Sequence, residues 1–204
     1  MKKIMIAFTA ALLAACSANT AETAANNGEP AVAHNENEWI LWALTTAAPS
    51  FIGENATVIA PDGTVLQEGS NGWTCQSASP MPMPETGYAT VREAVPACSD
   101  EAAQAWMMAY MAGEQPALET DGWMWMLHGD MGADNFDHTA MSIEDANAED
   151  WIVSGPHLMM MPADVSSIAN TTTDFTTGAP YLMFKGTGFD HLMIPLDGYF
   201  DFQN

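Results

Sequence analysis

Basic residues are scarce in this chain. Its 204 residues include 26 Asp and Glu against four Lys and Arg, two of which are Lys2 and Lys3. From residue 16 onward only Arg92 and Lys185 are basic, so 26 acids against two bases give a net charge of −24 with neutral histidines. Such a charge repels phosphate backbones and excludes nucleic acid as a partner. It is typical of a surface adapted to salt, or of one that binds divalent cations.

Apolar runs long enough to cross a membrane are also absent. Residues 4–13 are apolar but too few to span a bilayer, which takes about 20 residues as a helix. After Lys2 and Lys3, this run predicts a secretory signal over residues 1–15. The small residues before Cys16 resemble the lipobox of bacterial lipoproteins, which implies a diacylglycerol on that cysteine as the membrane anchor. The alternative is an ordinary cleavage site with an incidental cysteine. By resemblance to lipoprotein sorting in Gram-negative bacteria, Ser17 in place of Asp implies the periplasmic face of the outer membrane.

Cysteine is limited to three residues, so two remain once Cys16 is set aside. An even pair in an exported domain predicts a disulfide between Cys75 and Cys98. It would close a connection rich in Pro and Ser, "QSASPMPMPETG". No CxxC spacing supports the alternative of a reactive or metal-binding thiol pair.

The rest of the chain predicts a single domain after a tether. Residues 16–36, beginning at the lipidated cysteine, have few large apolar groups and predict a flexible tether, with one globular domain over 37–204. Residues 35–48 and 99–113 predict helices, capped by Asn35 and Ser99, the second ending at Gly113. Short β-branched or Met-rich runs around Pro61-Asp62-Gly63, in 122–129, 157–162 and 180–196 predict strands. We therefore expect an α+β fold: a mostly antiparallel sheet, one disulfide, and two main helices packed on one face.

Enzyme motifs are absent: the chain has no GxSxG, HExxH, SxxK or phosphate-binding glycine loop. A hydrolase would need His128 or His138 to meet a nucleophile in a cleft, as triads do on unrelated folds. The acidic stretch 130–150 offers carboxylates to Ca²⁺, although it lacks the EF-hand pattern. Calcium is the weaker of the two metal hypotheses.

The stronger metal hypothesis comes from two similar segments, "PHLMMMP" and "DHLMIP". Because strand side chains alternate, His157 shares a face with Met159, and His191 shares one with Met193. Imidazole with thioether is a ligand set suited to Cu(I). If the two strands lie close, these four residues predict a copper site. The alternative is that the methionines fill the core, where Met is a flexible packing residue.

Four segments, "ATVIAPDGTVLQEGSNGWTC", "AWMMAYMAGEQP", "PHLMMMP" and "GAPYLMFKGTGFDHLMIPL", resemble a family of uncharacterised exported bacterial proteins. The likeness covers most of the chain after Ala56. It implies one coherent domain and carries no catalytic residue. Our expectation is a lipid-anchored, non-catalytic binding or envelope-associated module with a protein or small-molecule partner. A soft-metal binder is the second hypothesis and a hydrolase the third.

Overall fold

The computed structural model describes residues 28–203. The predicted signal, Cys16 and most of the predicted tether therefore lie outside the described residues. The elements, in chain order, are α1 (Asn37–Thr45), α2 (Ser50–Gly53), β1 (Thr57–Ile59), β2 (Val65–Gln67), β3 (Thr74–Ser77), the 3-10 helix η1 (Val91–Ala94), β4 (Pro96–Ser99), α3 (Glu101–Ala112), β5 (Gly122–Met126), β6 (Ala133–Asp134), β7 (Trp151–Ile152), β8 (His157–Met161), the 3-10 helix η2 (Val165–Ser167), β9 (Tyr181–Met183) and β10 (His191–Pro195). None of the helices within residues 28–203 is long and apolar enough to cross a bilayer.

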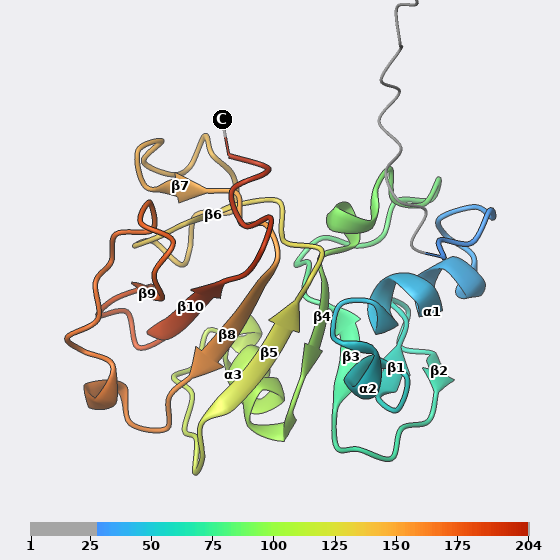
Figure 1. Cartoon of the computed structure of the whole chain (residues 1–204), viewed down its shortest axis with the longest axis horizontal. Helices are drawn as coiled ribbons and strands as arrows, with labels where there is room; N and C mark the ends of the chain where they lie inside the picture. Colours follow the sequence, from blue (N-terminus) through green and yellow to red (C-terminus); the bar gives the residue numbers. More distant parts are fainter. Residues whose placement is uncertain (1–27, 204) are drawn as a thin grey trace, which may run out of the picture.

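Eight strands form one sheet in the order β2-β1-β3-β4-β5-β8-β10-β9, while β6 and β7 pair separately (Figure 1). Every neighbouring pair in the large sheet is antiparallel except β1 with β3. The α+β class and the mostly antiparallel sheet are thus confirmed. So is the disulfide: Cys75 on β3 and Cys98 on β4 are bonded directly opposite each other.

Local turn chemistry explains two of the hairpins. Between β1 and β2, Gly63 has φ 85° and the Asp62 side chain accepts the backbone N–H of Thr64 at 2.9 Å. Between β9 and β10, Gly186 and Gly188 take φ 79° and 88°. These are left-handed conformations that glycine adopts without steric cost.

Both predicted helix caps are wrong by one residue, since the N-caps are Glu36 and Asp100. The N-cap of α3 is Asp100, whose carboxylate accepts the backbone N–H of Ala103 at 2.9 Å, while Ser99 is buried as the last residue of β4. Helix α1 begins at Asn37, and the Asn35 amide instead donates to the Glu85 carbonyl at 3.0 Å. In both places a tertiary contact competes with the local cap.

The expectation that both main helices cover one face of the sheet is not confirmed. Helix α1 packs on β3 and β4, with Trp39 and Leu44 in one apolar cluster with Cys98. Helix α3 packs on β5 and β8, with Trp106 in a second cluster that includes Ala97. Since adjacent strand residues point to opposite faces, Ala97 and Cys98 place the helices on opposite sides of the sheet. Figure 1 shows α3 behind β5 and β8, with α1 in front of the other half.

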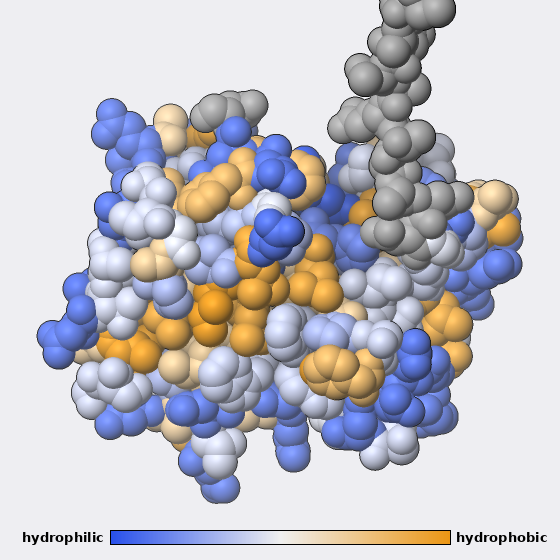
Figure 2. Space-filling view, viewed as in Figure 1, coloured by the Kyte–Doolittle hydropathy of each residue, from blue (hydrophilic) through white to orange (hydrophobic). Residues whose placement is uncertain are grey.

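The face of β5, β8 and β10 turned away from α3 is apolar and partly open to solvent. Its side chains are Trp123, Trp125, Leu158, Met160, Leu192 and Ile194. Figure 2 shows apolar surface across the middle of the sheet on this side. The methionines and histidines that alternate with these residues therefore face α3.

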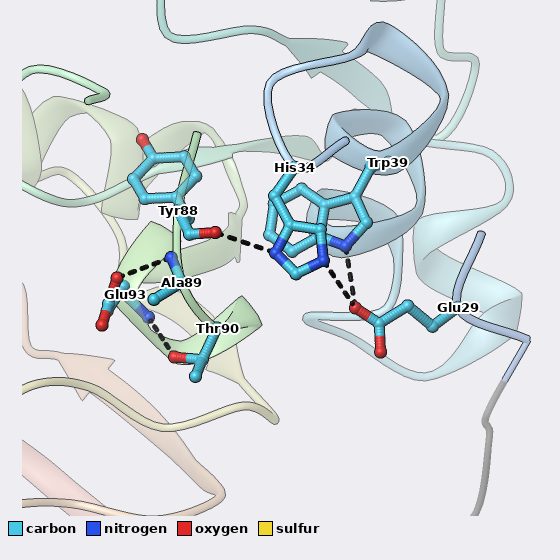
Figure 3. Close-up of polar contacts among 7 residues, drawn as sticks. All are labelled: Glu29, His34, Trp39, Tyr88, Ala89, Thr90 and Glu93. Carbon is cyan, nitrogen blue, oxygen red and sulfur yellow. Dashed lines mark hydrogen bonds and ion pairs between the residues drawn. The ribbon is translucent and has the colours of Figure 1, made fainter. Parts of the chain in front are cut away.

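Residues 29–35, which belong to the stretch assigned to the tether, are held against the domain (Figure 3). The Glu29 carboxylate accepts the indole N–H of Trp39 at 2.8 Å and lies 3.5 Å from Nε2 of His34. The His34 ring stacks on Trp39, and its Nδ1 lies 2.8 Å from the carbonyl oxygen of Tyr88. The His34 contact thereby holds the backbone of Tyr88, not its hydroxyl group.

Candidate functional site

A cavity of about 460 Å³ lies on the α3 side of the sheet. Its walls come from β5, β8, β9 and β10, from α3, from residues 78–84 of the β3–β4 connection, and from residues 130–141 of the acidic loop. Ten of the 16 methionines line it: Met81, Met107, Met111, Met124, Met126, Met131, Met141, Met159, Met183 and Met193. This volume lies within the range of small-molecule sites, about 300–1,000 Å³. We call this cavity the methionine pocket.

The sheet side of the methionine pocket follows from strand periodicity. Met124 and Met126 are two residues apart on β5, and Met124 lies directly opposite Met159 on β8. Met159 in turn lies opposite Met193 on β10. Side chains opposite each other on one face are about 5 Å apart, so these thioethers form a continuous row. Met is unbranched and polarizable, which lets such a row adapt to ligands of different shapes.

The structure brings only part of the predicted copper site together. Strands β8 and β10 pair antiparallel, with Met159 opposite Met193 and His157 opposite Pro195. The two histidines therefore lie on opposite sides of the row, about 13 Å apart along the strands at about 3.3 Å per residue. His191, Met159 and Met193 line the methionine pocket, whereas His157 lies outside its lining. Met183, which the sequence analysis did not single out, lies directly opposite His191 on β9.

Both imidazoles are held in one orientation by the backbone. Nδ1 of His157 lies 2.7 Å from the Gly155 carbonyl oxygen, and Nδ1 of His191 lies 3.0 Å from that of Phe189. Each Nδ1–H must donate to its carbonyl, which leaves Nε2 with a free lone pair. His157 Nε2 is buried without a hydrogen-bond partner. Burial lowers the pKa of each imidazole to about 4, so both rings are neutral near pH 7.

Asp130 supplies a carboxylate to the methionine pocket. One of its oxygens, Oδ1, accepts the backbone N–H of Gly132 at 2.9 Å and that of Ser154 at 3.0 Å. Burial raises its pKa to about 6, against the lowering effect of these two hydrogen bonds and of Arg92. No ion pair within 4.0 Å joins Asp130 to Arg92, whose guanidinium lies over the Phe202 ring. A carboxylate with a perturbed pKa in a cleft is a candidate functional group.

Two more polar groups line the same cavity. The Tyr88 hydroxyl is buried and has no hydrogen-bond partner among the described residues, and burial raises its pKa. Glu93 belongs to η1, where it accepts the backbone N–H of Ala89 while Thr90 accepts that of Glu93 (Figure 3). This reciprocal capping fixes Glu93 at the wall of the pocket.

Neither histidine considered for a hydrolase is placed beside a nucleophile. His128 Nε2 lies 2.7 Å from the Thr46 hydroxyl, which also donates to the Trp42 carbonyl at 2.7 Å and so can only accept from the imidazole. The His138 ring lies among aromatic rings, 4.8 Å from that of Phe189. No hydrogen bond joins either ring to a serine within residues 28–203.

The acidic loop uses its carboxylates to order its own backbone. Buried Asp134 accepts the backbone N–H groups of Phe136, Asp137 and Asn147 at 2.7–3.1 Å. Within residues 28–203 no group of three or more His, Cys, Asp or Glu side chains is arranged to hold a metal ion. Methionine thioethers are a separate class of metal ligand.

No family model, curated protein or solved structure matches this chain. The assignment of this site therefore depends on its geometry alone. Sequence reasoning singled out His191, Met159 and Met193, and included Asp130 only as part of the acidic stretch considered for Ca²⁺. It missed Tyr88 and the wall formed by residues 78–84. The available signal was the concentration of methionine after Trp106, combined with Met in the connection that the disulfide closes.

Proposed function

We propose that this protein is a lipid-anchored, exported binding protein that holds an apolar small molecule in the methionine pocket. The observation that carries the proposal is the cavity itself: about 460 Å³, lined by ten methionines, by Trp106 and Tyr110 of α3, and by Phe184 directly after β9. A few polar groups converge on it, the Asp130 carboxylate, the Tyr88 hydroxyl and the His191 imidazole. Such apolar walls with a few placed polar groups are typical of ligand sites.

Two features keep the pocket open to a ligand. Residues 78–84 form one wall, and the Cys75–Cys98 bond ties the base of that connection to the sheet. Another part of the lining, within residues 130–141, is ordered by Asp134. Pre-formed walls reduce the entropy lost when a ligand binds.

The test is titration of the mature chain, carrying Cys16→Ser, with the neutral fluorescent probe N-phenyl-1-naphthylamine. Ala140→Trp places a bulky side chain in the wall of the pocket, on a surface loop. Ala148→Trp, exposed on the same loop and outside the pocket lining, is the matched control. We expect saturable binding that Ala140→Trp weakens by about tenfold or more, equivalent to about 1.4 kcal/mol. Absence of saturable binding, or equal loss in both variants, would refute the proposal.

A second candidate function, Cu(I) binding, is favoured by the environment of His191. Its Nδ1–H donates to a backbone carbonyl, as it does in most metal-ligating histidines, and this leaves Nε2 free for a metal. Met183 lies directly opposite, Met193 lies two residues on, and Met159 lies opposite Met193. The neutral ring has no proton to lose on binding. These are one nitrogen and three soft sulfur donors, a set that suits Cu(I).

An oxygen-free Cu(I) titration against a competing chelator tests this second function. His191→Phe removes the proposed nitrogen ligand. His157→Phe, at the other histidine of the predicted copper site, is the matched control. We expect stoichiometric binding that His191→Phe abolishes and His157→Phe retains. Equal loss in the two variants would favour a site that uses both histidines, and absence of binding by the unmodified chain would eliminate copper.

Membrane attachment is a separate part of the proposal, supported by the signal and lipobox pattern that ends at Cys16. Expression of the full chain with labelled palmitate, followed by membrane fractionation, tests it. We expect the label and the membrane association to disappear in Cys16→Ser. An unlabelled but membrane-bound chain would show that another attachment operates.

A further inference from the structure

The charged side chains of the methionine pocket have one sign. Asp130 and Glu93 line it, while neither Lys nor Arg does. The histidine of its wall, His191, is neutral near pH 7 because burial lowers its pKa to about 4. From residue 16 onward the chain carries a net charge of −24. The long-range field and the local groups both favour a positively charged ligand.

Asp130 is the carboxylate best placed to meet such a ligand, because it lines the pocket. Its Oδ1 accepts two backbone N–H groups, and the Ser154 side chain also lowers its pKa. Arg92 also lowers the pKa of Asp130, while Met126 and Met131 belong to the same pocket lining. At pH 8 the carboxylate is ionised, because its pKa of about 6 lies well below that pH. A partly buried carboxylate gains more from a counter-charge than a fully exposed carboxylate does.

Aromatic rings complete the environment that a cation prefers. Trp106 and Tyr110 are stacked on α3 with centroids 5.4 Å apart, and Phe184 stacks against Tyr110 at 6.1 Å. All three line the pocket. Ring faces attract organic cations through their quadrupoles, and thioethers provide polarizable contact with apolar substituents.

We propose that the methionine pocket selects lipophilic organic cations, ammonium or phosphonium ions with apolar substituents, through Asp130. The substituents fill the space between the methionines and the aromatic rings, and the carboxylate balances the charge. This inference rests on the proposed function, since it names the class of molecule that the pocket takes.

Two ions of nearly the same size and shape, tetraphenylphosphonium and tetraphenylborate, differ in the sign of their charge and provide the test. The mature Cys16→Ser chain is titrated with each at pH 8, by displacement of N-phenyl-1-naphthylamine, in low salt and in 0.5 M NaCl, a concentration at which surface charges are screened within about 4–5 Å. Asp130→Asn removes the pocket charge. Glu144→Gln, exposed and outside the pocket lining, removes one charge from the surface and is the matched control.

We expect the phosphonium to displace the neutral probe and the borate to fail. Asp130→Asn should weaken phosphonium binding by about tenfold or more, and by a larger factor than it changes binding of the neutral probe, while Glu144→Gln should change neither. The preference should persist in salt, because buried charges are screened less than surface charges. Equal competition by the two ions, or an Asp130→Asn chain that binds phosphonium like the original, overturns the inference and leaves the proposed function standing. Failure of the neutral probe itself overturns both.

Discussion

Replacing Asp130 by Asn should make the folded protein more stable at neutral pH. Burial raises the pKa of this carboxyl from 3.8 to about 6, so the folded state holds the proton more tightly than the unfolded state does. As the pH rises from 3.8 to 6, the unfolded chain loses this proton first, and the free energy of unfolding falls. Above pH 6 the free energy of unfolding lost through this group stays constant. A shift of about two pKa units corresponds to about 3 kcal/mol.

Asn cannot ionise, yet its Oδ1 can still accept the N–H groups that Gly132 and Ser154 donate to Asp130. The free energy of unfolding of the Asp130→Asn chain should therefore exceed that of the original chain by up to about 3 kcal/mol at pH 7.5. For a domain of this size that equals roughly 6–12 °C in Tm, at about 2–4 °C per kcal/mol. At pH 3.5, where the carboxyl is protonated in both states, the difference should vanish.

Urea unfolding followed by tryptophan fluorescence at pH 7.5 and pH 3.5 measures both values. Glu144→Gln serves as the control, because removing any negative charge from so acidic a chain relieves some repulsion. The reasoning is refuted if Asp130→Asn is no more stable than Glu144→Gln at pH 7.5, or if its advantage is the same at both pH values. A confirmed advantage would mean that an ionised Asp130 lowers stability, as strained functional sites do.

Three further predictions concern other parts of the site. Burial lowers the pKa of His157 to about 4, so stability is lost as the pH falls from 6.5 to 4, by about 3 kcal/mol for this residue; His157→Phe should show a smaller loss between pH 7 and pH 4 in urea unfolding. Replacing Cys75 and Cys98 by Ala should lower the free energy of unfolding by about 3 kcal/mol and weaken N-phenyl-1-naphthylamine binding; unchanged affinity in the folded variant would show that the wall at 78–84 is held by other contacts. Asp134→Ala leaves three backbone N–H groups without their acceptor and should lower the free energy of unfolding by about 3 kcal/mol in the same assay at pH 7; a loss below about 1 kcal/mol would show that water replaces the carboxylate.

Patterns that depend on a few neighbouring residues were predictable. Asp62 and Gly63 specify their turn because a side-chain acceptor and a left-handed glycine act within four residues. Gly113 ends α3 for the same reason, with φ 67°. Alternation along β8 and β10 placed His157 and Met159 on one face, and His191 and Met193 on one face, before any pairing was known.

The helix N-caps, and the face of the sheet that each helix covers, were less predictable because several local choices are close in energy. Ser99 and Asp100 are both good N-caps, and Ser99 is drawn into β4, where it pairs with Met124. Nothing in the periodicity of residues 37–45 or 101–112 says which side of the sheet each helix covers. That choice depends on long-range packing, with Leu44 against Cys98 and Trp106 against the methionine row.

The sequence by itself determined the export signal pattern, the acidic surface, the cysteine pairing, and which residues of each strand share a face. These follow from composition and from the periodicity of the chain, which is two residues in a strand and three to four in a helix. Only the tertiary structure decided that β8 and β10 run antiparallel, which joins Met159 to Met193 and separates His157 from His191. It alone brought residues 78–84 and 130–141, about 50 positions apart, into the lining of one cavity. The physical reason is that a pocket is formed by segments that are distant in the sequence. The side chains that line it depend on the strand order and on the face of the sheet that α3 covers.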